Sequence, residues 1–428
     1  SFHKSVAVTV HINSGNPAYP FPQFLEYACG GNLGTLNPEG VVHAEMEQDI
    51  RDAYQIHANE FEYTGEVYNN VKYIWTSDKQ AYDCTEGDGY ALLAAAYMAD
   101  LVTFNGVWMC THDKRRVRTK TYSGCEDNTA NYIYGPYAIG DDSKRRGNTN
   151  YNTAADGDVD VALALYVAYK QWGEFMRDVD GNIINDACGN PISLKQEMIE
   201  VIRGLVALSM PSEFVLGDHI DDTKKARVYS GIIGLDGYPK GGDTWGEQTT
   251  WASTNPIIES SLSIMLLPEG EMKDVSGYEI RPDQSYAKDQ HIDYNAPAFY
   301  REFRDLLHKL AEEGDIPANE FEEEQFRRAE ASSDWLVNEL TKKNEHTVLQ
   351  AGWCTVSDDG SQTTFRNFND GEDWRCPMRQ ILNYVWHGNP EYTWNPKTHQ
   401  VEAGGNTFEY DAGVRLSNFF KDPASWNP

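Results

Sequence analysis

The sequence lacks long apolar runs and has few basic residues. Its longest apolar stretch, around residues 91–98, ends near Asp100 and is far shorter than the ~18 residues that a membrane span needs. Only 36 Lys and Arg stand against 66 Asp and Glu, which gives a formal net charge of −30. Since phosphates attract the opposite charge, we expect a soluble protein that binds neither nucleic acid nor a membrane. A neutral or cationic glycan is a compatible partner, whereas an anionic polysaccharide is disfavoured.

Motifs of several enzyme classes are also absent. The chain has neither the Gly-x-Ser-x-Gly of serine hydrolases nor the His-Glu-x-x-His of zinc proteases. Its seven cysteines include no Cys-x-x-Cys pair, which disfavours a zinc knuckle or a thioredoxin-type site. Cys110 and Cys125 could close a loop, and free buried thiols are the alternative. We therefore expect no metal and no cofactor.

The segment 178–186 has acids at alternate positions, as a calcium loop does. Its glycine, Gly181, stands at the fourth place instead of the sixth, and no closing Glu follows. An Asp-Gly turn is therefore the favoured interpretation.

The chain starts at Ser1, without Met and without a charged-then-apolar leader. A processed secreted or periplasmic protein starts in this way, and we expect that localisation, although trimming of the chain would look the same.

Residues 154–173 are the most informative stretch. Apolar residues recur there at helical spacing and predict a helix with a broad buried face: Val161, Leu165, Ala168 and Trp172. The helix would begin with three acids in five residues, Asp156, Asp158 and Asp160. One acid would be an ordinary N-cap, so a capped and solvated helix start is one interpretation. Three like charges so close together indicate a binding or catalytic site instead.

A second acidic helix entrance comes about 70 residues earlier. Glu86 and Asp88 alternate with glycines ahead of an apolar run, and we expect one long helix over residues 88–113. Glu86 and Asp156 would then be two carboxylates that two helix starts deliver to one cleft.

These segments resemble glycoside hydrolase family 8. Asp156-Gly-Asp-Val-Asp-Val-Ala-Leu-Ala-Leu is similar to that family's signature, Ala-Ser/Thr-Asp-Ala/Gly-Asp followed by Ile-Ala. Thr85-Glu86-Gly87-x-Gly-Tyr90 resembles its Ser/Thr-Glu-Gly-Gln-x-Tyr-Gly segment, which holds the general acid. Trp374-Arg375-Cys-Pro-Met-Arg resembles its Asp-Ala-Trp-Arg stretch, which bears the general base. The three segments occur in the family's order.

The resemblance implies roles for particular residues. Glu86 would be the general acid of an inverting reaction, and Asp156 would bind the sugar and help to position water. Position favours Glu372 as the base, because it stands three residues before the Arg, whereas residue type favours Asp373. The substrate would also contact Tyr90, Asp158, Trp374 and Arg375.

Aromatic residues in irregular passages add two further candidates for substrate binding. Tyr137 lies in a Gly-, Asn- and Tyr-rich passage that ends near residue 151, and Trp245 lies in a long irregular excursion over residues 218–251. Aromatic rings stack on the apolar faces of sugars, although core packing explains such residues equally well.

The expected fold is all-α, and the resemblance implies an (α/α)6 barrel with long irregular loops. We expect residues 1–40 to be an irregular lead-in packed on the barrel, and residues 41–428 to be a single catalytic domain. About eight substantial helices can be recognised, fewer than such a barrel needs. Either further helices lie in passages that read as loops, or the barrel is incomplete at the C-terminus, or part of the natural chain is absent from this sequence.

The family covers several glycans, so the motifs leave the substrate open. We favour internal β-1,4 linkages of xylan, with cellulose, mixed-linkage β-glucan and chitosan as alternatives, and we expect a monomer. A polysaccharide lyase would want basic residues to neutralise a uronate, which the charge of −30 argues against. The alternative that is not an enzyme is a carbohydrate-binding protein with a decayed site.

Overall fold

The computed structural model of the 428-residue chain describes these residues: 43–76, 85–115, 120–125, 154–206, 225–227, 232–234, 236–242, 264–266, 272–274, 279–281, 289–343, 351–357, 359–368 and 375–421. The chain divides into two compact units. Unit 1 comprises residues 1–131 and 137–202, and unit 2 comprises residues 132–136 and 203–428. The expected lead-in, residues 1–40, lies outside the described residues, and the single catalytic domain stays a prediction.

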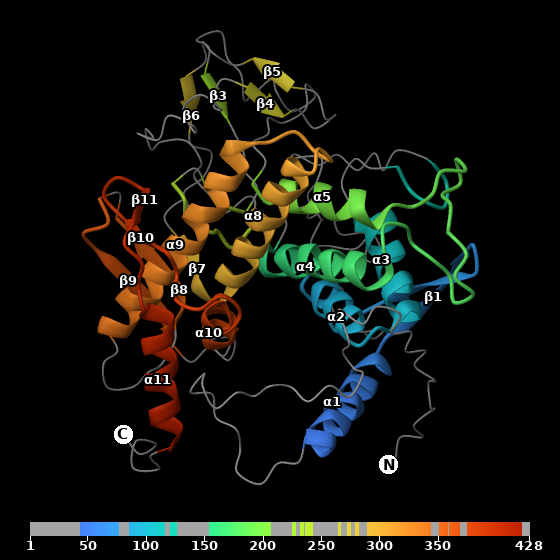
Figure 1. Ribbon diagram of the computed structural model, residues 1–428, viewed down its shortest axis with the longest axis horizontal. Coiled ribbons are helices and arrows are strands. Elements are labelled where there is room, and N and C mark those ends of the chain that lie inside the picture. Colours follow the sequence, from blue (N-terminus) through green and yellow to red (C-terminus); the bar gives the residue numbers. More distant parts are fainter. Residues whose placement is uncertain are drawn as a thin grey trace. The chain divides into compact units, whose positions relative to one another are not determined.

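Unit 1 is a helical body with one β-hairpin (Figure 1). Its elements are α1 (His43–Ala58), β1 (Glu62–Tyr68), β2 (Val71–Trp75), α2 (Thr85–Tyr97), α3 (Leu101–Arg115), α4 (Ala155–Trp172) and α5 (Leu194–Gly204). Strands β1 and β2 pair antiparallel through a tight turn at Asn69 and Asn70, which both adopt positive φ.

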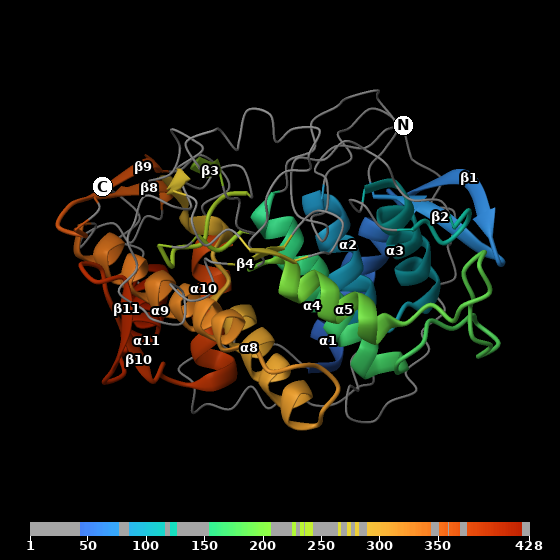
Figure 2. The same ribbon diagram turned by 90° about the horizontal axis from the view of Figure 1, so that it is seen from above.

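Helix α4 is buried on almost every side, and Figure 2 shows it alongside α2. Val161, Leu165 and Ala168 are fully buried, as their helical spacing predicted. A helix that is buried on nearly every side lies inside a domain, so α4 belongs to the core of unit 1.

The prediction of one long helix over residues 88–113 is wrong, because this segment forms two helices. Helix α2 ends at Tyr97, Ala99 takes a φ of 53°, and α3 begins at Leu101. Asp100 stabilises the break, since it accepts from the Thr103 amide at 3.1 Å and from the Tyr54 hydroxyl at 2.9 Å. The apolar pattern continues through the break, so local sequence could not reveal it.

Two similar turns follow α4. Asp178 accepts hydrogen bonds from the amides of Asp180 and Asn182, and Asp186 accepts in the same way from the amide of Asn190. The carboxylate of Asp178 thus binds its own turn, which confirms the Asp-Gly turn over the calcium loop.

The disulfide differs from the pairing that the sequence suggested. Cys125 pairs with Cys188 across 63 residues, whereas Cys110 is a buried thiol outside this disulfide.

Unit 2 combines helices with short strands (Figure 1). Its elements are β3 (Lys225–Arg227), β4 (Ile264–Leu266), β5 (Met272–Asp274), β6 (Glu279–Arg281), β7 (Asp289–His291), the 3₁₀ turn η2 (Ile292–Tyr294), α8 (Pro297–Glu312), α9 (Glu320–Lys343), β8 (Ala351–Val356), β9 (Thr363–Phe368), α10 (Arg375–His387), β10 (Tyr392–Asn395), β11 (Gln400–Ala403) and α11 (Phe408–Lys421).

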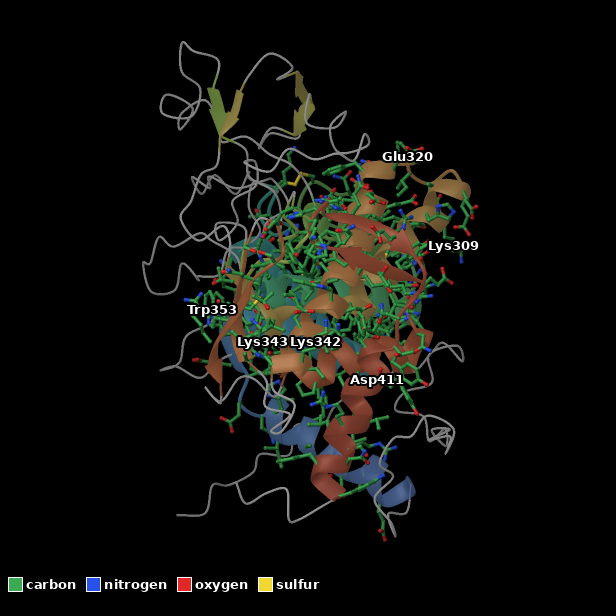
Figure 3. The ribbon with its side chains drawn as sticks, turned by 90° about the vertical axis from the view of Figure 1, so that its left-hand side faces the viewer. Lys309, Glu320, Lys342, Lys343, Trp353 and Asp411 are labelled. Carbon is green, nitrogen blue, oxygen red and sulfur yellow. A yellow bond between two sulfur atoms is a disulfide. The ribbon has the colours of Figure 1, made fainter. Side chains whose placement is uncertain are left out.

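The longest helix of unit 2 carries charges that match its dipole. Glu320 lies in the first turn of α9, and Lys342 and Lys343 lie in the last, so each sign stands at the helix end that favours it (Figure 3). Strands β7, β8 and β9 form an antiparallel sheet beside this helix, with His291 opposite Trp353.

The part of the chain that the structure describes is mostly helical, as expected. None of its helices has the length and the apolar character that crossing a bilayer requires.

Candidate functional site

Two glycines bring the starts of α2 and α4 into backbone contact. A Cβ on Gly157 would lie 2.5 Å from the carbonyl carbon of Thr85, and a Cβ on Gly89 would lie 2.8 Å from the carbonyl oxygen of Gly157. Such distances leave no room for a side chain at either position, because the two backbones touch. The glycines next to the predicted acids thus hold the two helix starts together.

The acids at the start of α4 are buried instead of solvated, and none of them is the N-cap residue. Ala154 is the N-cap residue and makes no side-chain capping bond. Asp156, Asp158 and Asp160 are 0%, 4% and 2% exposed. Asp156 accepts a hydrogen bond from the Gly157 amide at 2.9 Å. Since burial of a carboxylate costs free energy, three of them at one helix start indicate a built polar site.

Glu86 lies in the first turn of α2 and is half-buried. The hydroxyl of Tyr90, one turn later on the same helix, donates to its Oε1 at 3.3 Å. This bond orients the carboxyl group. Because the backbone of Gly157 touches that of Glu86, the structure brings Glu86, Tyr90, Asp156 and Asp158 to one pair of helix starts.

Asp88 has a different role from its neighbour Glu86. It is 2% exposed and accepts from the hydroxyls of Thr76, at 2.8 Å, and Thr111, at 2.9 Å. It therefore ties α2 to the end of the hairpin and to α3, which fixes the direction in which α2 starts.

Unit 1 contains a second buried polar cluster, around His112. Its Nδ1 lies 3.0 Å from Oδ1 of Asp113, its Nε2 lies 3.5 Å from Oε1 of Glu197, and its ring stacks on Tyr122. Burial opposes ionisation of Asp113, but the hydrogen bond and the charge of His112 outweigh it and lower the pKa to about 2. We assign this saturated network to the packing of α3 and α5.

Arg375 is the one predicted site residue of unit 2 within the described residues. It begins α10, is 2% exposed, and donates from Nη2 to Oδ2 of Asp293 at 2.8 Å. Its guanidinium lies 4.9 Å from the centre of the Tyr294 ring. A buried, directed guanidinium of this kind is suited to holding a polar group in a fixed position.

Sequence reasoning missed the partners of Arg375. Asp293 is fully buried and also lies 2.8 Å from Nδ1 of His291, whose ring stacks on Tyr294 and touches that of Trp353. The sequence feature that could have indicated these partners is His291-Ile-Asp293-Tyr294, a cluster of polar and aromatic residues shortly before a Pro-Ala-Phe helix start.

The remaining predicted site residues lie outside the described residues, so their roles stay predictions: Glu372, Asp373, Trp374, Tyr137 and Trp245. Among the residues that the structure does describe, one group could offer three metal ligands, Cys125, Asp186 and Cys188. The disulfide between its two cysteines removes their ability to coordinate.

Comparison with known proteins agrees with these features. Residues 61–195, which contain both glycine contacts and both acidic helix starts, match the model of "Glycosyl hydrolases family 8". No curated protein sequence matches the chain.

Solved structures with a similar fold include a reducing-end xylose-releasing exo-oligoxylanase, at 13% identity and a TM-score of 0.52 over 90% of this chain and 73% of that one. A family 8 xylanase from Teredinibacter turnerae, crystallised with xylohexaose, is 14% identical over 82% of this chain and 71% of its own, at a TM-score of 0.49. A β-1,3-1,4-glucanase from Paenibacillus sp. X4 is 13% identical over 89% of this chain and 84% of its own, at 0.47.

The likeness to the exo-oligoxylanase shows the fold, and it confirms the predicted all-α, (α/α)6-type class. The match of residues 61–195 to the model of glycoside hydrolase family 8 confirms the resemblance that the motifs predicted.

Proposed function

We propose that the protein cleaves internal β-1,4 linkages of a neutral plant polysaccharide, with xylan favoured, by an inverting mechanism. One observation carries the proposal: the contact between Gly157 and the backbone of residues 85 and 86 joins the helix starts that bear Glu86 and Asp156. An inverting glycosidase needs one carboxylic acid at the leaving oxygen and a second carboxylate that activates water on the opposite face of the sugar.

Each residue has a defined part in this reaction. Glu86 protonates the leaving oxygen, and Tyr90 orients it through the 3.3 Å bond to Oε1. Asp156 binds the sugar and helps to position the water. We assign the base to Asp373, with Glu372 as the alternative. Arg375, held by Asp293, lies two residues beyond Asp373 and fixes the start of α10.

The choice of glycan rests on charge and on the similar proteins. A net charge of −30 disfavours anionic polysaccharides. Xylan is favoured because the Trp374-Arg375 pair resembles the xylan-active branch of the family, and the structures of similar fold include xylanases and a β-1,3-1,4-glucanase. Cellulose, mixed-linkage β-glucan and chitosan stay alternatives. We further propose a secreted or periplasmic monomer.

Release of reducing ends from four plain polysaccharides tests the proposal: xylan, cellulose, mixed-linkage β-glucan and chitosan. We expect new reducing ends on xylan, with products of mixed length. Anomeric proton signals in the first minutes should show the α-anomer, whereas a β-product would require a retaining mechanism with carboxyls only ~5–5.5 Å apart. No release from any of the four would favour the carbohydrate-binding protein with a decayed site.

A further inference from the structure

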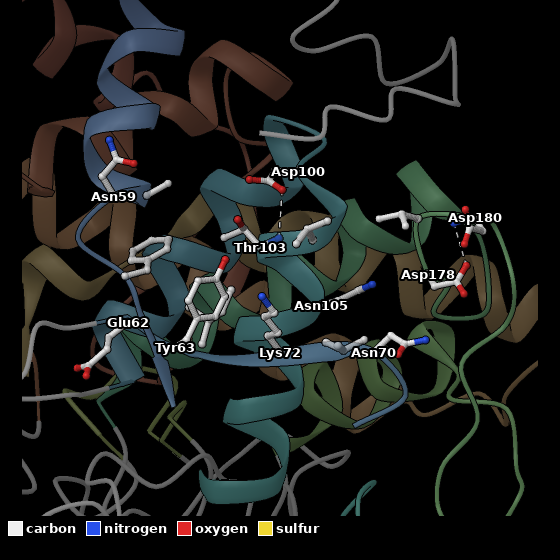
Figure 4. A pocket seen from close by; sticks show the side chains of 16 residues that line it. Asn59, Glu62, Tyr63, Asn70, Lys72, Asp100, Thr103, Asn105, Asp178 and Asp180 are labelled. Carbon is white, nitrogen blue, oxygen red and sulfur yellow. Dashed lines mark hydrogen bonds between the residues drawn. The ribbon is translucent and has the colours of Figure 1, made fainter. Parts of the chain in front are cut away.

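A pocket of about 420 Å³ lies in unit 1 at the other end of the helices that carry Glu86 and Asp156. The end of α1, the β1–β2 hairpin, the start of α3 and the turn at Asp178 line it (Figure 4). Glu86 is in the first turn of the 13-residue α2. The first residue after this helix that lines the pocket is Asp100, which lies beyond the last turn. From Glu86 to the end of α2 at Tyr97 the helix rises by ~17 Å at 1.5 Å per residue, and this length of helix lies between the two. The pocket is therefore not a part of the acidic helix starts.

The charged side chains of the pocket differ in whether they already bind other groups of the protein. Asp100 already binds Tyr54 and Thr103, and the carboxylate of Asp178 binds its own turn. Lys72 and Asp180, in contrast, take part in no ion pair among the described residues. Both can therefore bind a ligand.

An aromatic ring and several amides complete the lining. Tyr63 is 53% exposed, and Nζ of Lys72 lies 5.1 Å from the centre of its ring. Asn105 is 3% exposed and donates to the carbonyl of Arg177, while its Oδ1 has no donor among the described residues. Asn59 and Asn70 add further amide groups to the lining.

We propose that this pocket is a second carbohydrate-binding site, which holds one or two units of a neutral saccharide. An exposed tyrosine ring offers a face for the apolar side of a pyranose, and amides, an ammonium and a carboxylate suit hydroxyls that both donate and accept. Four acids against one lysine in the lining disfavour a phosphate or a uronate. The volume falls at the small end of the range for ligand pockets, ~300–1,000 Å³, which fits one or two sugar units.

Such a site would hold a polysaccharide chain at a place remote from the bond that is cleaved. Binding at two points on one chain raises the effective concentration at each, so the protein would stay longer on long or insoluble substrates than on short ones. The site does not depend on Glu86, so it can be tested separately from the reaction.

The test follows hydrogen–deuterium exchange in the Glu86→Gln protein during a titration with xylotriose, and again with cellotriose. We expect protection in peptides that span residues 59–74 and 100–105, in addition to peptides at residues 85–90 and 155–160. Tyr63→Ala should weaken binding about tenfold at the first pair of peptides and leave the second pair unchanged. Tyr410→Ala, at a 41% exposed tyrosine of unit 2, is the matched control and should change neither.

Results of two kinds would overturn the inference. One is the absence of protection at residues 59–74 and 100–105 with both sugars, or protection that Tyr63→Ala leaves unchanged. The other is equal protection by trigalacturonate, which would contradict the neutral class of ligand. Protection at residues 59–74 without protection at 85–90 would count against the proposed function and still support the second site.

Discussion

Gly157 lies directly against the backbone of Glu86: a Cβ on the glycine would stand 2.6 Å from the Glu86 amide nitrogen. Residues 71 positions apart in the sequence thus share one contact, and the helix starts that carry the two predicted carboxylates cannot separate without breaking it. The position of each acid depends on this contact.

Gly157→Ala should therefore disturb the site as well as the fold. Overpacking of a close backbone contact costs ~1–3 kcal/mol, and α4 must move away from Glu86 to admit the methyl group. We expect a melting temperature several degrees lower and, at a temperature where the variant is folded, a loss of at least ten-fold in turnover of xylan.

Gly106→Ala is the matched control for this change. Its Cβ would lie 2.6 Å from the carbonyl oxygen of Lys72, so a similar loss of stability is expected, but away from the acids. Equal losses of turnover in the two folded variants would contradict a special role for the contact at Gly157.

The variants Asp156→Asn and Asp160→Asn distinguish the roles of two acids of α4. Both residues are buried, but Asp160 lies one turn farther into the helix, where its Cβ would be 2.9 Å from a Cβ on Gly89. We expect Asp156→Asn to lower turnover by about 100-fold and Asp160→Asn by less than ten-fold, measured as kcat on xylan with melting temperatures as controls. The reverse order would mean that the family signature has been misaligned.

Asp293→Asn should destabilise unit 2 strongly, because it removes the buried carboxylate that pairs with the buried guanidinium of Arg375 at 2.8 Å. Removing one partner of a buried ion pair costs ~3–5 kcal/mol. Asp305→Asn is the control, since that pair with Arg304 has the same 2.8 Å distance but a 56% exposed carboxylate, and such pairs contribute ~1 kcal/mol or less. The free energy of unfolding of both variants in urea tests this prediction. Equal losses of stability would show that burial of the ion pair has no effect.

Stability should fall as the pH rises from about 4 to 7. Burial raises the pKa of Asp334 to about 7, and burial followed by the charge of Asp334 raises the pKa of Glu409 well above its usual value. Between the ordinary and the raised pKa the folded protein holds protons that the unfolded chain has lost, so folding becomes less favourable as pH increases. Asp113, with its pKa of about 2, adds a dependence only below pH 4.

Glu409→Gln isolates this effect, because the amide keeps the shape and does not ionise. We expect the variant to melt several degrees higher than the wild type at pH 8 and to show a flatter slope between pH 4.5 and 8. Asp411→Asn, at an exposed acid of the same helix, should leave the slope unchanged. A wild-type melting temperature that rises through this window, with the same slope in Glu409→Gln, would refute the assignment.

The sequence predicted the parts of the site in which local pattern and chemistry coincide. The acids at the starts of two apolar helices indicated both the helices and a shared site. The structure adds that Gly89 and Gly157 permit the close approach that brings those acids together. The buried stripe of α4 followed from spacing alone.

Contacts between distant residues could not be predicted in this way. The break at Ala99 depends on Tyr54, 46 residues before Asp100, and Arg375 is held by Asp293, 82 residues away. No periodicity reports such partners. The disulfide from Cys125 to Cys188 was not predicted for the same reason, since Cys110, which is nearer to Cys125 in the sequence, is buried in α3.

Glu86→Gln tests the central claim most directly. The amide has the shape of the acid and can still accept from Tyr90, but it cannot deliver a proton to the leaving oxygen. Glu320→Gln, which changes an acid in the first turn of α9, is the matched control. We expect Glu86→Gln to melt like the wild type and to lose at least 1,000-fold of its rate of reducing-end release from xylan, whereas Glu320→Gln keeps it. Hydrolysis at the wild-type rate by folded Glu86→Gln would contradict the account.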